Sequence, residues 1–230
     1  MKPSHFPGLT GNQLKILALI SMTCDHVGLV LLPQFPVLRI IGRLAFPIFA
    51  YMIGESCRHT RNLDRYFRTM GLFALVCQVG SFLATGSLYQ SVLVSFTLSI
   101  GLVWLLKNAK FSPVINILWI TAGLGTVFFL CHGLPYLLPG TDYSIDYGFP
   151  GVILPVLVFL GGGKVWGLPL FGAGLVTLSL YYGGIQWWCL AALILLALYN
   201  GKRGNTGMKK LFYFYYPAHL VVIYLLGIMF

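Results

Sequence analysis

Hydrophobic residues run along this chain in long stretches, and polar residues gather in the short gaps between them. Runs of this kind are typical of membrane helices, which need about 20 apolar residues each, whereas barrel strands alternate apolar and polar positions. The pattern predicts an all-α, polytopic integral membrane helix bundle. Its nine predicted helical segments cover residues 14–32, 37–56, 66–85, 90–106, 113–131, 147–161, 165–182, 185–200 and 211–229.

The composition excludes a soluble globular domain. Hydrophobic residues make up 58% of the 230 residues and charged residues only 9%, where soluble domains carry roughly 25% charged residues. The net charge of +10 does not indicate nucleic-acid binding, because the basic residues lie in the gaps between apolar segments. The five cysteines are scattered and form no CxxC pair, so we expect neither a metal site nor a disulfide framework.

Lysine and arginine occur in alternate gaps. The gaps at 33–36, 86–89, 132–146 and 183–184 contain neither residue, and the gaps between them are basic. Because basic loops stay on the cytoplasmic side, this alternation predicts nine spans, a cytoplasmic amino terminus with a short leader (residues 1–11) and an external carboxyl terminus. We expect one transmembrane domain over 1–230, located in a bacterial cytoplasmic (inner) membrane.

Three ionisable residues, Lys15, Asp25 and His26, interrupt the first apolar segment. They argue against a cleaved signal peptide, and no small-residue cleavage site follows. At about 100° per residue, Lys15 and His26 lie on one helix face, about 16 Å apart along the axis. Such residues are costly inside a bilayer and need a partner or a function. His26 is the best candidate general base, because imidazole titrates near neutral pH.

Arg39 and Arg43 lie one turn apart in the second segment, at a depth similar to that of Asp25. Arg43 is the expected cross-helix partner of Asp25. An ion pair that only fixes helix packing is one interpretation, and an electrostatic effect of Asp25 on His26 is the other. Adjacent residues point about 100° apart, so Asp25 and His26 do not form a simple linear dyad.

Other polar residues are more ambiguous. His5, His59 and His132 fit interfacial positions, whereas His219 lies inside the ninth segment, where a structural and a functional role are equally open. Asp146 either caps the sixth helix or attracts a cationic acceptor. The arginine-rich gap that contains Arg58 and Arg61 fits a topogenic role, and it also suits contacts with a polyanionic cofactor.

Two long stretches resemble the TraX family, named for the conjugative-pilus protein that N-acetylates pilin. They are LTGNQLKILALISMTCDHVG (9–28) and LRIIGRLAFPIFAYMIGESCRHTRN (38–62). The resemblance continues through DYGFPGV (146–152) and through YNGKRG and FYFYYPAHL between residues 199 and 220. Lys15 and His26, with ten residues between them, are also similar to a pattern of wider transmembrane acyltransferases, which include acyltransferase family 3 and heparan-alpha-glucosaminide N-acetyltransferase.

The resemblance implies an acyltransferase that takes acetyl-CoA or another acyl-CoA from the cytosol and modifies an external acceptor. The acceptor classes are a pilin amino terminus, a surface glycan and a small amine. His26 with Asp25 would be catalytic, and the donor would contact basic residues: Lys15, Arg43, Arg58 and Arg61. The candidates for acceptor binding are Arg39, Asp146, Tyr147 and His219.

Two other functions fit the same residues. A proton-coupled carrier would use Asp25 and His26 as a proton relay, and a non-catalytic scaffold would use the buried charges only for packing. The expected partners are acyl-CoA, the external acceptor and the lipid bilayer, without a metal or nucleic acid. The oligomeric state is open, with a homodimer as one option.

Overall fold

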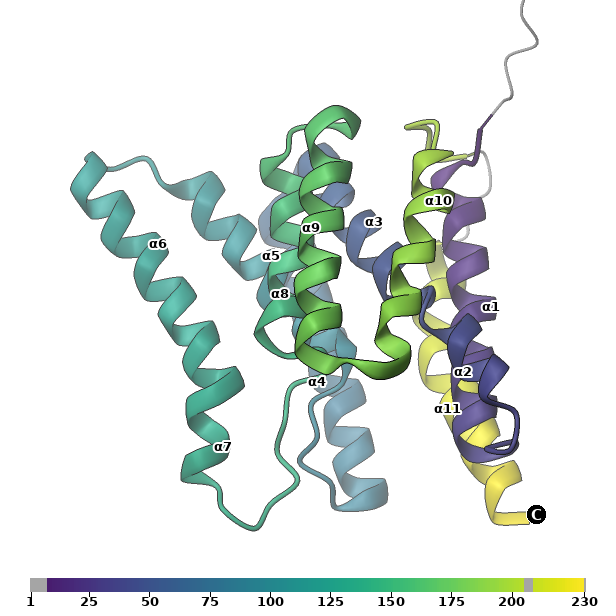
Figure 1. Ribbon diagram of the computed structural model, residues 1–230. Helices are drawn as coiled ribbons and strands as arrows, with labels where there is room; N and C mark the ends of the chain where they lie inside the picture. The colour runs from purple at the N-terminus through teal and green to yellow at the C-terminus, as the bar shows by residue number, and fades with distance from the viewer. Residues whose placement is uncertain (1–7, 205–208, 230) are drawn as a thin grey trace, which may run out of the picture. The chain divides into compact units, whose positions relative to one another are not determined.

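The computed structural model describes residues 8–204 and 209–229, and these residues form helices joined by short turns (Figure 1). Over these ranges the β-type contacts are two isolated bridges, so the all-α prediction is confirmed. The helices are α1 (Gly11–Val30), α2 (Pro36–Gly42), α3 (Ala45–His59), α4 (Leu63–Thr85), α5 (Val92–Asn108), α6 (Pro113–Phe128), the π-helix η1 (Phe129–Gly133), α7 (Leu134–Leu137), α8 (Gly148–Leu160), α9 (Lys164–Tyr182), the 3₁₀-helix η2 (Gly184–Ala191), α10 (Ala192–Ala197) and α11 (Lys209–Met229).

Each of the nine predicted apolar segments is helical, and five of them are long and apolar enough to cross a membrane. The five are Gly11–Val30, Pro36–His59, Leu63–Thr85, Pro113–Leu137 and Val165–Tyr182. Shorter apolar helices cover Val92–Asn108, Gly148–Leu160, Gly184–Ala197 and Tyr213–Met229. These helices identify a membrane protein; nine complete crossings and the sides of the two termini stay predictions.

The second predicted segment is broken where the sequence analysis expected one helix. α2 ends at Gly42, Arg43 and Leu44 form a turn, and α3 starts at Ala45. Pro47 explains the break, because its ring has no N–H for the carbonyl of Arg43 and clashes with that carbonyl in a continuous helix. The break places Arg43 at the end of a short helix rather than in the middle of a long one.

Two other boundaries differ from the predicted ones. The helix that starts at Pro113 does not end at residue 131 but continues through η1 to Leu137, and Pro135 explains the wider turn because it has no N–H for Cys131. The segment predicted at 185–200 starts as the 3₁₀-helix η2. A 3₁₀-helix rises about 2.0 Å per residue, so Gly184–Ala197 reaches about 25 Å although it is short.

The helices form two compact units, and each is described by itself. Unit 1 comprises the described parts of residues 1–52 and 175–230, so it contains α1, α2, α10 and α11. Unit 2 comprises residues 53–174 and contains α4 to α8. The prediction of one transmembrane domain stays a prediction.

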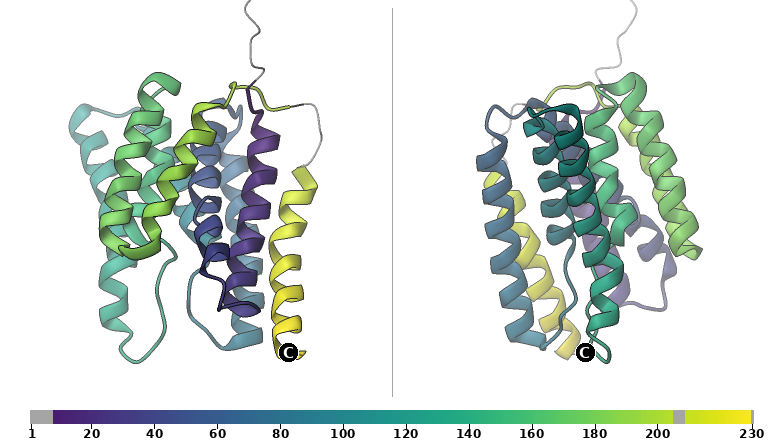
Figure 2. Two further views of the ribbon diagram at one scale, coloured as in Figure 1. Left: turned by 45° about the vertical axis from the view of Figure 1, so that its right-hand side comes forward. Right: turned by 90° about the vertical axis from the view of Figure 1, so that its left-hand side faces the viewer.

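In unit 1, side-chain contacts fix the relative direction of the helices. The Oγ of Ser21 donates to the carbonyl of Ile41 (2.5 Å), and Gly28 lies against Leu38, so α2 runs antiparallel to α1. Successive residues along α1 contact successive residues along α11. The two helices therefore lie side by side and run parallel (Figures 1 and 2). Parallel first and last helices are what an odd number of crossings requires.

The start of α1 is closed by its own side chains and by the strand-like stretch before α11. Thr10 and Gln13 form a capping box, which satisfies two backbone N–H groups. The N–H groups of Gly11 and Asn12 donate to the carbonyls of Lys202 and Arg203 at 2.8 and 3.0 Å. The segment that precedes α11 is thereby tied to the first turn of α1.

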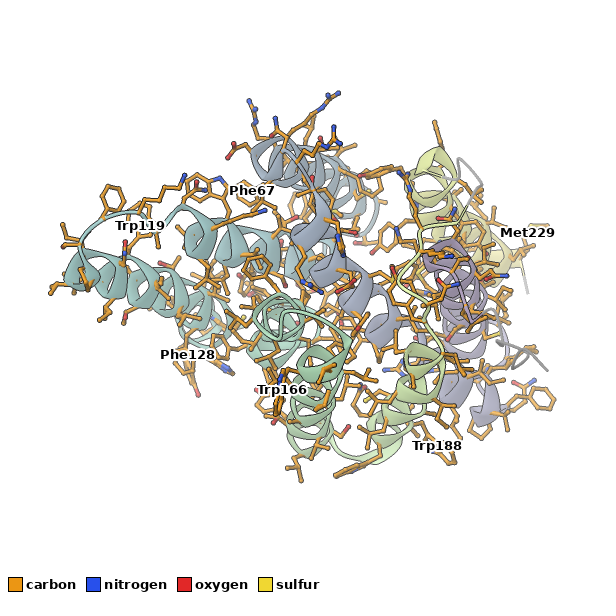
Figure 3. All side chains as sticks on the ribbon, turned by 90° about the horizontal axis from the view of Figure 1, so that it is seen from above. Phe67, Trp119, Phe128, Trp166, Trp188 and Met229 are labelled. Atoms are coloured by element: carbon orange, nitrogen blue, oxygen red, sulfur yellow. The ribbon has the colours of Figure 1, made fainter. Side chains whose placement is uncertain are left out.

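In unit 2, α5 packs against α4 and α8. Two buried serines of α5 make hydrogen bonds in this region: Ser99 donates to the carbonyl of Val152 in α8 (2.7 Å), and Ser95 donates to the carbonyl of Asp146 just before α8 (2.5 Å). Large apolar side chains are exposed on both units, and Trp166 and Trp188 point away from the helices that carry them (Figure 3). Exposed apolar faces of this extent are expected where helices contact lipid.

Candidate functional site

Asp25 lies between two arginines of the α2 region. Its Oδ2 is 2.7 Å from Nη1 of Arg39, and its Oδ1 is 2.5 Å from Nη2 of Arg43. All three side chains are at most a quarter exposed. The expected contact between Asp25 and Arg43 is therefore present, and Arg39, which the sequence analysis assigned to the acceptor, is a second partner of the same carboxylate.

Small residues allow the approach of α2 to α1. A Cβ at Gly42 would lie 2.2 Å from Oδ1 of Asp25, closer than any real contact. A Cβ at Gly28 would lie 2.7 Å from Cβ of Leu38. Glycine at both positions lets the backbone of α2 reach the carboxylate, and the two guanidiniums then satisfy it with charge-assisted hydrogen bonds.

His26 contacts α11 rather than α2. Its Nδ1 lies 2.9 Å from the carbonyl oxygen of Met22 and 3.4 Å from Nε2 of His219. The two rings meet edge to face with centroids 5.0 Å apart. Asp25 and His26 therefore point to different helices, as their adjacency in the sequence predicts, and His219 is the titratable neighbour of His26.

Backbone carbonyls fix the tautomers of both histidines. Nδ1 of His219 lies 2.8 Å from the carbonyl oxygen of Tyr215, and Nδ1 of His26 lies 2.9 Å from the carbonyl oxygen of Met22. A carbonyl only accepts, so in the neutral rings both hydrogens are on Nδ1. Nε2 of His219 is then an acceptor that faces His26, and Nε2 of His26 has a lone pair available for a substrate.

Tyr215 of α11 contacts both Thr23 of α1 and the ring of His219. The hydroxyl of Thr23 donates to the carbonyl of Leu19 (2.9 Å), so the hydroxyl of Tyr215, 2.5 Å away, donates to Oγ1 of Thr23. The ring of Tyr215 stacks on His219 with an angle of 10° between the planes. The hydroxyl contact and the stacked rings fix the position of His219 relative to α1.

Arg43 also contacts Gln186, a residue that the sequence analysis did not single out. Nη1 of Arg43 lies 3.4 Å from Oε1 of Gln186, and Gln186 is 5% exposed. A glutamine inside an apolar segment can be recognised in the sequence, but its partner, 143 residues away, cannot. Its place beside the Asp25 cluster extends the polar interior of unit 1 to η2.

Lys15 lies in the first half of the unbroken helix α1, so the expected shared face with His26 is retained. Arg203 lies close enough to Lys15 to interact with it electrostatically. Two cationic side chains therefore stand near the start of α1, at the opposite end of the face from His26. Arg203 was part of a basic gap in the sequence, and only the contact of residues 202 and 203 with α1 reveals its position.

The remaining predicted site residues belong to unit 2. Arg58 contacts Glu55 (2.6 Å) and the carbonyl of Gly162 (2.6 Å), while Arg61 is exposed after α3. The prediction that Asp146 caps the sixth helix is wrong: the N-cap of α8 is Tyr147, in a left-handed conformation and without a side-chain cap. Asp146 instead uses its backbone, donating to Gln90 (2.9 Å) and accepting from Ser95. His5 lies outside the described residues.

No group of three histidine, cysteine, aspartate or glutamate side chains that suits a metal ion is present among the described residues. Unit 1 offers two kinds of chemistry on α1: an imidazole that faces α11, and an arginine–aspartate–arginine cluster that faces α2. Such a site can accept a proton and stabilise negative charge.

Comparisons with known proteins agree with the resemblance seen in the sequence. The chain is 25% identical to the probable fimbrial assembly protein FimC, serogroup H1, of Dichelobacter nodosus, over 92% of this chain and 93% of that protein. A short region, 19% of this chain and 17% of the relative, is 51% identical to an uncharacterized protein of Rickettsia prowazekii (strain Madrid E). No solved structure matches the chain. The sequence profile described as TraX protein matches residues 10–227, nearly the whole length, so the chain belongs to the TraX family.

Proposed function

We propose that this protein is a membrane acyltransferase. It takes an acyl group, most simply acetyl, from cytosolic acyl-CoA and transfers it to an amine or hydroxyl at the external side of a bacterial cytoplasmic membrane. The observation that carries the proposal is the side chain of His26, an imidazole inside α1 whose Nδ1 lies 2.9 Å from the carbonyl oxygen of Met22. Because a carbonyl only accepts, the neutral ring has its hydrogen on Nδ1 and its lone pair on Nε2.

The reaction needs one proton acceptor. The acceptor nitrogen or oxygen attacks the thioester carbonyl carbon and loses its proton to Nε2 of His26. The carbon–sulfur bond then breaks, the sulfur leaves with the electron pair, and it takes the proton from His26 to form the thiol of CoA. His26 returns to its neutral form, so the transfer balances without another reactant.

Lys15 supports the same assignment from the other end of the face. It stands about 16 Å from His26 along α1, a separation comparable to the reach of an extended pantetheine arm. A donor whose phosphates meet Lys15 and Arg203 would bring its thioester toward His26. In this proposal Arg39 and Arg43 do not bind phosphates, since both already contact Asp25; they supply positive charge near the reacting carbonyl.

The relatives favour a pilin subunit as the acceptor. The TraX family is named for a protein that N-acetylates pilin, and the FimC relative is named for fimbrial assembly. The parallel direction of α1 and α11 supports termini on opposite sides of the membrane, which an enzyme with a cytosolic donor and an external acceptor would use. We therefore propose the amino terminus of a pilin subunit as the first acceptor to test.

The experiment is a transfer assay with the full-length protein in lipid nanodiscs, labelled acetyl-CoA and a pilin-type peptide with a free amino terminus. The wild type should transfer label, and His26→Gln should lower the rate by about 10²–10⁴-fold, the usual loss when a general base is removed. The matched control is His132→Gln, the same change at the π-helix η1. Transfer by His26→Gln at the wild-type rate would sink the proposal.

A carrier or a scaffold would give other results. A carrier would show substrate-dependent proton flux in proteoliposomes and no labelled product. A scaffold would show neither activity, and His26→Gln would be silent in both assays.

A further inference from the structure

Two histidines from opposite ends of the chain meet inside unit 1. Nε2 of His219 lies 3.4 Å from Nδ1 of His26, across 193 residues of sequence. His219 is buried, at 7% exposure, and its ring contacts the rings of Tyr215 and Tyr216, which pack against a buried apolar cluster of unit 1. The acyl transfer described above needs only His26, so the position of His219 is unexplained by it.

The hydrogen positions make the contact directional. The carbonyl of Tyr215 holds the hydrogen of His219 on Nδ1, so Nε2 of His219 has no hydrogen to donate in the neutral ring. The hydrogen on Nδ1 of His26 is shared between the carbonyl of Met22 and this Nε2. His219 is therefore the acceptor and His26 the donor of the contact.

We infer that His26 and His219 act as one unit that holds a single proton, with His26 facing the substrate and His219 as its positioning residue. The catalytic part of the inference rests on the proposed function; the shared proton does not. When Nε2 of His26 takes a proton from the acceptor, the hydrogen on its Nδ1 moves toward Nε2 of His219. When His26 returns a proton to the leaving sulfur, that hydrogen moves back, and no proton is gained or lost overall.

The surroundings limit the pair to one proton. The charged and titratable groups near it are Asp25 on α1, Arg39 and Arg43 in the α2 region, and Tyr215 and Tyr216 on α11. Asp25 with its two arginines carries one net positive charge. A second imidazolium with its ring centroid 5.0 Å from the first would add like-charge repulsion in a poorly solvated place.

A neutral acceptor suits this position better than a carboxylate. An imidazole accepts the Nδ1 hydrogen of His26 without another buried negative charge, which would need a further partner. The contact is long at 3.4 Å in the neutral pair, and it becomes a charge-assisted hydrogen bond when His26 is protonated. His219 therefore favours the charged form of His26, the form that transfer creates.

The test is nuclear magnetic resonance of ¹⁵N-labelled histidine in the full-length protein in nanodiscs. The variant His26→Gln identifies the His26 signals by their loss. In the wild type, the His26 and His219 signals should change together over one pH interval, as coupled sites do. In His219→Phe, His26 should titrate alone and bind its proton about tenfold more weakly, because the acceptor of its Nδ1 hydrogen is gone.

Two further variants keep the test interpretable. His219→Gln retains an acceptor oxygen in a side chain of similar length, so His26 should keep most of its proton affinity but titrate as a single site. The matched control is His132→Phe. His132 lies in η1 with its ring close to that of Phe128, and its replacement should leave the His26 titration unchanged. An unchanged, single-site titration of His26 in the wild type and both His219 variants would overturn the shared proton.

An activity measurement separates this inference from the proposed function. If the wild type transfers acetyl groups, His219→Phe should lower kcat by roughly 10- to 100-fold with little change in KM for acetyl-CoA, and His219→Gln should recover part of the loss. A parallel rise in KM without loss of kcat would contradict the positioning role. Absence of any transfer by the wild type would reject the proposed function, and the titration would still decide the shared proton.

Discussion

The two units treat polar side chains differently. Unit 1 places a carboxylate, two guanidiniums and two imidazoles along the second half of α1. Unit 2 buries neutral groups in its helices, such as Ser95 and Ser99, and its buried acidic residue Glu55, at 7% exposure, lies one turn before the end of α3. Glu55 meets Arg58 at the end of α3, Asp64 of α4 accepts from Trp104 of α5, and Asp142 meets Ser87 between loops.

The difference indicates where chemistry is possible. Glu55 is buried, but its partner Arg58 follows three residues later on the same helix, whereas Asp25 lies in an apolar helix and takes both of its arginine partners from the α2 region. Charged groups in such a position are retained only with partners or a function. In unit 1 the carboxylate, the two guanidiniums and the two imidazoles each make a specific polar contact. The proposed acyl transfer would therefore take place in unit 1, with unit 2 in a supporting role.

Removing the charge of Asp25 should give the largest difference in stability between changes in the two units. Asp25→Asn leaves Arg39 and Arg43 without their carboxylate and should lower the free energy of unfolding by about 3–5 kcal/mol, the usual cost of breaking a buried ion pair. The control is Glu55→Gln in unit 2, the same change where Arg58 keeps the carbonyl of Gly162 as a partner. Thermal unfolding in micelles measures both, and equal losses would remove the distinction between the units.

A smaller effect should follow from one methyl group between α1 and α2. Gly42→Ala places a Cβ against the carboxylate of Asp25 and should cost about 1–3 kcal/mol as the helices separate. Gly80→Ala in α4 is the matched control, because among the described residues no atom outside its own helix backbone lies within 4 Å of the added Cβ. There the change should be neutral or stabilise the helix by about 0.5–1 kcal/mol. A Gly42→Ala variant as stable as Gly80→Ala would show that close packing of α2 is not required.

The smallest effect belongs to the loops of unit 2. The side-chain hydroxyl of Ser87, and then the backbone N–H of Leu88 (2.8 Å), hold the pKa of Asp142 below its ordinary value of 3.8. A lowered pKa means that the contact stabilises the loops above pH 3.8 and is lost as the pH falls through the lowered value. Protection of the Leu88 amide against hydrogen exchange should therefore decrease only in acid. Asp142→Asn should remove that pH dependence, and protection that ignores both changes would show that this contact is not formed.

The pattern of apolar segments was enough to predict the helices, because each needs only local sequence to satisfy its backbone. The effects of proline on the carbonyl four residues earlier were missed: Pro47 breaks the second segment, and Pro135 widens a turn of a helix that continues beyond its predicted end. The contact of Asp25 with Arg43 was predictable, since a buried charge requires an opposite one and the region offered few choices.

Contacts across long stretches of sequence were not predictable. Periodicity places His26 and His219 on faces of their own helices, but it does not say which helices are neighbours. Gln186 was missed as a neighbour of Arg43 for the same reason. Arg39 was assigned to the acceptor although it lies one turn from Arg43, because one carboxylate needs only one arginine to neutralise its charge. The roles of Lys15, Arg58, Arg61, Tyr147 and the other site residues stay predictions until transfer is measured.

The histidine contact has a consequence for biosynthesis. His26 enters the membrane with the first helix, and the 193 residues that separate it from His219 take roughly 10 to 40 s to synthesise at common bacterial rates. Asp25 meets its arginines early, because they follow within 18 residues. His26, by contrast, has only the carbonyl of Met22 in its own helix as a partner until the final helix inserts. A nascent or prematurely terminated chain therefore has the charge cluster but lacks the contact of His26 with His219, so that under the proposed function it would transfer acyl groups more slowly than the full-length protein.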